Sequence, residues 1–106
     1  MAKFLAIASY NPAGVQGLLK DGGSKRRDVV KKTIESLGGT LEAFYYAFGD
    51  ADLYAIIDFP DNVTTAAAAL AINSTGAVSS KSIALLTPEE IDAAAQKIVA
   101  YSAPGQ

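Results

Sequence analysis

The stretch GGTLEAFYYAFGDADLYAIIDFP, residues 38–60, predicts the β-hairpin around which the rest of the chain is organised. Residues 40–48 and 53–59 are rich in the aromatic and β-branched side chains that strands favour. The intervening Gly49-Asp50-Ala51-Asp52 contains the Gly and Asp residues typical of turns. Neither strand has a predominantly polar face, which indicates a sheet covered on both sides.

The segment before the hairpin predicts one strand and one helix. Residues 3–10 (KFLAIASY) form a short apolar run that suits a central strand, and Asn11-Pro12 ends it because proline cannot donate to a sheet ladder. Residues 13–23 are expected to form a long connection containing at most one helical turn. Ser24 is a suitable N-cap for a helix that runs to about residue 37. Its apolar stripe is Val30, Ile34 and Leu37.

The segment after the hairpin predicts a helix, a strand and a final helix. Asp61-Asn62 precedes an alanine-rich run over residues 63–73, whose small side chains allow a helix to lie close to a sheet. Residues 78–86 then form a fourth strand. Thr87-Pro88-Glu89-Glu90 is a strong helix start, with a hydroxyl cap, an early proline and acids near the positive end of the helix dipole. This helix is amphipathic to Tyr101.

This order predicts one α+β domain over residues 1–106, with the last few residues as a flexible tail. Right-handed crossovers fold βαββαβ into a ferredoxin-like, four-stranded antiparallel sheet with two helices on one face and an added C-terminal helix. The other sheet face is left open and is expected to carry aromatic side chains from the set Phe44, Tyr46, Phe48 and Tyr54. Such a patch favours a homodimer or higher oligomer that pairs two sheets. The alternative is that the last helix folds back over its own sheet.

The composition excludes several classes of protein. The chain has no Cys and no His, which removes thiolate chemistry, a Ser-His-Asp triad and the commonest zinc ligands. Its net charge of −2 argues against nucleic acid or a membrane as partner. The apolar run over residues 4–8 is too short for a signal peptide, so a cytoplasmic location is expected. No metal and no cofactor are expected.

The predicted topology brings one set of polar residues to one end of the sheet. The first strand ends there, the first helix begins there, and the hairpin turn lies beside them. Three interpretations are open: Arg26 pairs with Asp50 or Asp52, the glycine-rich helix start binds an anion, or the two aspartates hold a hard cation. The candidate residues are Tyr10, Ser24, Arg26, Arg27, Gly49, Asp50 and Asp52.

The turn also resembles a known family. Gly38-Gly39-Thr40-Leu41-Glu42-Ala43-Phe44-Tyr45, followed by Gly49-Asp50-Ala51-Asp52, is similar to the GYD domain family of small bacterial proteins. The resemblance extends to Tyr10, to Arg26-Arg27, to residues 53–60 and to residues 86–90. In many members of the family the turn reads Gly, an acid, Tyr, Asp, and here Ala51 stands at the Tyr position. The resemblance implies a ferredoxin-like domain, similar to the dimeric α/β barrels, and implies no reaction.

Three functions compete on this basis. The first is a homo-oligomeric module, without catalysis, that binds a small anionic or aromatic ligand or has a regulatory role. The second is a small cofactor-free oxygenase, isomerase or decarboxylase acting on an apolar or aromatic acid. Arg26 or Arg27 would then hold the acid, and Tyr10, Tyr46 or Tyr54 would donate a proton. The third is an RNA-binding sheet, which the acidic chain disfavours. An apolar pocket with converging polar groups discriminates between the first two.

Overall fold

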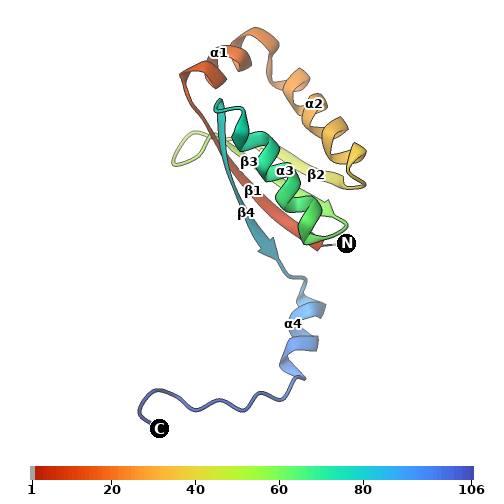
Figure 1. The fold of residues 1–106 in the computed structure, drawn as a ribbon, viewed down its shortest axis with the longest axis vertical. Coiled ribbons are helices and arrows are strands. Elements are labelled where there is room, and N and C mark those ends of the chain that lie inside the picture. Colours follow the sequence, from red (N-terminus) through yellow and green to blue (C-terminus); the bar gives the residue numbers. More distant parts are fainter. Residues whose placement is uncertain (1) are drawn as a thin grey trace.

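The computed structural model describes residues 2–106, which form a single α+β domain followed by a C-terminal arm (Figure 1). The elements are β1 (Ala2–Tyr10), α1 (Pro12–Asp21), α2 (Gly23–Ser36), β2 (Thr40–Tyr46), β3 (Leu53–Phe59), α3 (Asn62–Ser74), β4 (Val78–Leu85) and α4 (Pro88–Ala95). None of the helices in residues 2–106 combines the length and hydropathy that a bilayer span requires.

The four strands form one sheet in the order β2-β3-β1-β4, and every neighbouring pair is antiparallel. Phe4 of β1 lies opposite Ile57 of β3, and Ala8 lies opposite Leu53. Helices α2 and α3 lie on the same face of the sheet (Figure 1). The ferredoxin-like arrangement expected from the order of strands and helices is therefore confirmed.

The core lies between this face and the two helices. Its buried side chains are Phe4, Ile34, Ala55, Ile57, Phe59 and Ala68. Val30 of α2 and Leu37, its C-cap, pack against this cluster, so the expected apolar stripe is confirmed. The rings of Phe4 and Phe59 are tilted, with their centroids 6.4 Å apart. Ala68 is the α3 residue buried in this cluster.

A β-bulge in β2 changes which side chains reach the open face of the sheet. Leu41 lies opposite Ile57 and Ala43 lies opposite Ile56, so Glu42 is an extra residue in the ladder. Phe44 consequently packs on the core side, and Tyr46, two residues further, contacts α2. The expectation that these two rings lie on the open face was wrong.

Tyr45 and Tyr54 lie directly opposite each other on that open face instead. Tyr54 was expected there, whereas Tyr45 was not. Phe48 lies in the exposed loop between β2 and β3 rather than on the sheet. The bulge thus removes Phe44 and Tyr46 from the open face and places Tyr45 there, whereas Phe48 is absent from it because β2 ends at Tyr46.

The connection after β1 is a full helix rather than the single turn that the sequence suggested. The side chain of Asn11 accepts a hydrogen bond from the backbone N–H of Gly14 at 2.9 Å, and Pro12 occupies the first turn of α1. Gly22, with φ of 85°, separates α1 from α2 and serves as the N-cap of α2. Ser24 lies inside the first turn of α2, so its expected role as the N-cap was wrong.

The chain ends in a C-terminal arm, residues 86–106, which stands away from the sheet (Figure 1). Thr87 and Glu90 form the expected capping box, with the Glu90 N–H donating to Thr87 Oγ1 at 3.1 Å and the Thr87 N–H donating to Glu90 Oε1 at 3.0 Å. Helix α4 stops at Ala95 and does not reach Tyr101 as expected. Its residues are exposed, so it leaves the open sheet face uncovered, contrary to the fold-back alternative.

Candidate functional site

The polar end of the sheet is built around Asp52, the last residue of the hairpin loop. Its carboxylate accepts a hydrogen bond from the Tyr10 N–H at 2.8 Å, and its own N–H donates to the Ala8 carbonyl at 2.9 Å. Its carbonyl accepts from the Ala47 N–H at 2.9 Å. Asp52 therefore ties the hairpin loop to the end of β1. Ala51 beside it is buried, 4% exposed, so the position of the family's Tyr lies inside the protein here.

Arg26 reaches the same end from the first turns of α2. Its guanidinium lies 4.0 Å from the Asp21 carboxylate, and this is its ion pair among residues 2–106. The expected pairing with Asp50 or Asp52 was wrong, because Gly22 turns the chain so that the end of α1 lies beside the start of α2. A contact of 4.0 Å between partly exposed groups is weak. Arg26 is therefore free to bind another carboxylate.

Two tyrosines surround Arg26. The Tyr46 hydroxyl donates to the Gly23 carbonyl at 3.1 Å, and a Cβ at Gly23 would lie only 3.0 Å from the Tyr46 ring. Burial raises the pKa of Tyr10, and the neighbouring Tyr46 raises it further, against the opposing effect of Arg26. Burial likewise raises the pKa of Tyr46, again opposed by Arg26. Both phenols are thus protonated hydrogen-bond donors at neutral pH.

An apolar cavity of about 170 Å³ lies between the sheet, α2 and α3. Tyr10 and Arg26 line it, together with hydroxyl groups of a few Thr and Ser residues. The rest of its lining is aliphatic and aromatic: Ala6, Ala8, Val29, Val30, Ile34, Phe44, Leu53, Ala55, Ile57, Phe59, Ala68, Ala69, Ile72 and Val78. An apolar cavity with a few polar groups at one end is the usual form of a small-molecule site.

Small side chains on facing elements explain the cavity. Helix α2 packs chiefly against β2, and α3 packs against β3 and β4, so the space over β1 lies between them. Ala6, Ala8 and Ala55 form its floor, and Ala68 and Ala69 face it from α3. Sequence reasoning assigned the alanines of α3 to close packing on the sheet and missed the cavity. The sequence did contain a signal for the cavity: alanine occupies core-facing positions on β1, on β3 and on α3 together.

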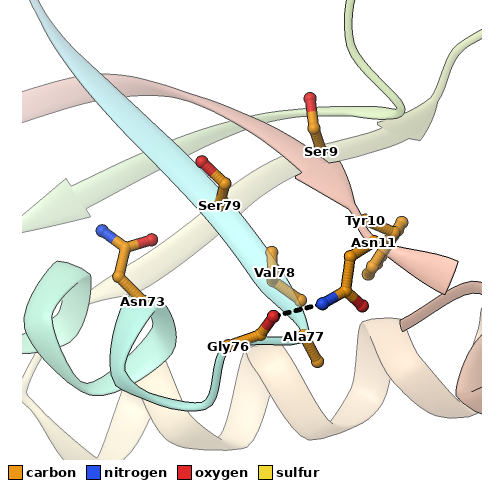
Figure 2. A pocket seen from close by; sticks show the side chains of 8 residues that line it. All are labelled: Ser9, Tyr10, Asn11, Asn73, Gly76, Ala77, Val78 and Ser79. Atoms are coloured by element: carbon orange, nitrogen blue, oxygen red, sulfur yellow. Dashed lines mark hydrogen bonds between the residues drawn. The ribbon is translucent and has the colours of Figure 1, made fainter. Parts of the chain in front are cut away.

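A wider cleft lies nearby, between the end of β1 and the start of β4 (Figure 2). It measures about 360 Å³, and its amides are engaged in bonds within the protein. The Asn11 side-chain amide donates to the Gly76 carbonyl, as drawn in Figure 2. The Asn73 side-chain oxygen accepts from the Ser80 N–H at 2.8 Å. These bonds tie β1 and α3 to β4, so we assign the cleft a structural role and take the apolar cavity as the candidate site.

The remaining predicted residues lie outside the cavity. Ser24 and Asp50 are exposed, and a Cβ at Gly49 would meet nothing within 4 Å. Arg27 is exposed and pairs with Asp28 at 3.2 Å. Of the seven candidates, the structure brings together Tyr10, Arg26 and Asp52. In the described part of the chain no three acidic residues cluster as metal ligands, which leaves the cation interpretation without a built site.

Comparison with known proteins gives one match. A family model described as the GYD domain matches residues 4–95, which is most of the chain. No curated protein and no solved structure matches the chain. The matched residues include β1, the hairpin, α2 and α3, and therefore every residue that lines the apolar cavity.

Proposed function

The chain belongs to the GYD domain family, and we propose that it is a homo-oligomeric module that binds a small apolar carboxylic acid without catalysis. The observation that carries this proposal is the apolar cavity with Arg26 and Tyr10 at one end. The ligand's apolar part enters the cavity, and its carboxylate stays at the polar end.

The size of the cavity sets the size of the apolar part. An engineered apolar cavity of about 150 Å³ in another protein binds benzene, and this cavity measures about 170 Å³. A single six-membered ring, aromatic or saturated, therefore matches the space between the sheet and the helices. Two fused rings exceed it unless side chains move.

The polar end selects the acid. A guanidinium binds a carboxylate through two parallel N–H groups, and Arg26 is held only weakly by Asp21. Tyr10, protonated at neutral pH, lines the cavity beside Arg26 and adds no negative charge that would oppose the acid. A neutral ligand of the same size would leave the charge of Arg26 without this partner, so the site favours the anion.

Self-association is the second part of the proposal. The open sheet face presents Leu5, Ile7, Tyr45, Tyr54, Ile56 and Ile83, which sit opposite one another in the strand register. At one end of this face Lys3 pairs with Glu42 and lies 3.4 Å from Asp58, so each of these charged groups has a partner of opposite charge. An identical face can therefore cover the apolar residues without burying an unpaired charge at that end.

A cofactor-free enzyme is the alternative, and one observation favours it. Tyr10 lies at the cavity with its phenol protonated, so its O–H could protonate a carbanion or enolate formed from a bound acid. Abstraction of a proton needs a base, and a phenol of raised pKa is a poor one at neutral pH. The cavity residues thus include a proton donor and lack an evident base, which is why binding is the preferred function.

Benzoate serves as the probe that tests binding. Benzoate should raise the Tm of the wild-type protein, while acetate lacks the ring and benzyl alcohol lacks the charge, so each should raise it less. Arg26→Met keeps an unbranched side chain and removes the charge, and it should abolish the benzoate shift. Arg27→Met is the matched control and should keep it.

Two results would reject the acid site. One is an equal benzoate shift in Arg26→Met and in the wild type, and the other is equal shifts with benzoate and benzyl alcohol. Native mass spectrometry of freshly purified protein complements the test, because it reports the number of chains and any bound acid together. Conversion of the probe to a second compound, lost in Tyr10→Phe, would replace the binding module with the enzyme.

A further inference from the structure

The chain exposes more surface than a compact protein of its size. Its accessible area is 7469 Å², whereas a compact monomer of this mass exposes about 5,600 Å². Its radius of gyration is 17.0 Å, against about 13 Å for a globular domain of this length. The excess area, about 1,800 Å² per chain, exceeds the roughly 800 Å² that each partner buries in a standard interface.

The C-terminal arm accounts for the elongated shape and carries apolar side chains. Ile98 is 101% exposed, Tyr101 is 78% exposed, and Leu86, Ile91 and Val99 are also exposed. An arm of this composition buries none of these side chains against its own domain. Large exposed apolar groups on one segment indicate a surface that another molecule covers.

The start of the arm holds it away from its own sheet. Thr87 precedes Pro88, which restricts Thr87 to extended conformations, and its φ and ψ are −73° and 158°. The capping box then fixes the beginning of α4. Between Gly76 and Gly105 the sequence has no glycine that would permit a tight reversal onto the sheet. The arm therefore continues outward from β4.

We propose that the arm of each chain packs against a second copy of the same chain. Ile83 and Leu85 lie on the open face at the end of β4, and Leu86 directly follows them as the first residue of the arm, so apolar residues continue from the open face into the arm. A copy that covers the open face thus also lies against the arm. In a two-fold symmetric dimer each arm packs against the other subunit.

Charge supports a second copy as the occupant. The first two turns of α4 carry Glu89, Glu90 and Asp92, which oppose binding to an anionic membrane. Lys81 lies on the open face opposite Ile7 and has no carboxylate within 4.0 Å among residues 2–106. The acidic start of the partner's arm supplies the charge that Lys81 lacks.

Full-length variants test the role of the arm, which rests on the self-association proposed above. Ile98→Asp combined with Tyr101→Asp places two charges on apolar positions of the arm. Gln96→Asp combined with Ser102→Asp adds the same charge at polar positions and is the matched control. In sedimentation equilibrium the first pair should raise the dimer dissociation constant at least about tenfold relative to the control pair.

A second measurement shows whether the arm contacts the partner chain or its own chain. The chain has no Cys, so Ser102→Cys takes a single spin label. When the spin-labelled chain is mixed with ¹⁵N-enriched wild type, which carries no label, amide signals of β4 in the ¹⁵N copy should broaden. Label on Ser36→Cys, in the exposed last turn of α2, should broaden them less.

Each result that would contradict the proposal concerns one part of it. Equal dissociation constants for the two double variants, or no more broadening of β4 by the label at residue 102 than by the label at residue 36, would overturn the arm's role and leave sheet pairing intact. A wild-type monomer at all concentrations would overturn both forms of self-association. The benzoate shift reports on the cavity independently of either outcome.

Discussion

Substitution of Ala68 by leucine tests the cavity through the sign of its effect on stability. Ala68 lies on α3, is 8% exposed and lines the cavity. Leucine adds three carbon atoms, each worth about 0.8 kcal/mol when buried. Ordering the longer side chain costs about 0.5–1 kcal/mol. If the three carbons enter the cavity of about 170 Å³, the net stabilisation is about 1.5–2 kcal/mol.

The assay is denaturant unfolding followed by circular dichroism, together with a thermal scan. The expected gain corresponds to a rise in Tm of roughly 6–16 °C for a domain of this size. Ala66→Leu is the matched control, since Ala66 is exposed on the same helix and outside the cavity lining. It should change stability by no more than about 0.5 kcal/mol. Ala68→Leu should also abolish the benzoate shift, because leucine occupies the space of the ring.

A loss of stability in Ala68→Leu, instead of a gain, would refute the reasoning. Insertion of leucine into a filled core forces side chains off their rotamers and costs about 1–3 kcal/mol. A loss of stability of that size in Ala68→Leu, with Ala66→Leu unchanged, would mean that side chains already occupy the space. An unchanged benzoate shift in a stabilised Ala68→Leu protein would place the acid elsewhere.

Three further predictions concern the polar end and the open face. Asp52→Ala removes the acceptor for the Tyr10 N–H and should lower the free energy of unfolding by about 1–2 kcal/mol in denaturant. Asp50 is exposed, so Asp50→Ala should lower it by at most about 0.5 kcal/mol. Equal losses in the two variants would contradict the role of Asp52. Tyr54→Asp places a charge on the open face and should yield a folded monomer in sedimentation equilibrium. Phe48→Asp places the same charge in the exposed loop and should keep the dimer. A dimer in both variants would show that this face is not the interface. The folded chain holds the Tyr10 proton more tightly than the unfolded chain because burial raises its pKa, so this stability is present below about pH 10 and is lost as the pH rises through the raised pKa. Unfolding measured over that range should show a smaller loss in Tyr10→Phe, and an identical slope would contradict the burial of the phenol.

The elements that the sequence predicted well are those specified by local chemistry. The hairpin strand over residues 53–59 and the caps at Asp61 and Thr87 depend on residues close together in the chain. The order of strands then limited the topology to the ferredoxin-like sheet, because crossovers in such sheets have one hand. Asn11-Pro12, assigned to the end of the strand, also begins a helix, since Asn caps and Pro suits the first turn.

The composition of the candidate site was only partly predictable. Topology brought Tyr10, Arg26 and Asp52 to one end of the sheet, as the sequence suggested. Their partners were not predictable, because Gly22 sets the angle between α1 and α2 and thereby places Asp21 rather than Asp52 beside Arg26. Ser24 and Arg27 share the sequence of the same helix start, yet the helix turns both of them toward solvent.

The sequence by itself determined the four strands, the helix starts at Asp61 and Thr87, and the order that builds the sheet. Tertiary structure alone decided which side chains lie on each face of the sheet and how much space is left between the sheet and the helices. The extra residue at Glu42 reverses the alternation of β2, because side chains on a strand repeat every two residues. The cavity arises because alanines distant in sequence face one another across a gap between α2 and α3. A volume between layers depends on how far apart the backbones lie, and no pattern within a single element encodes that separation.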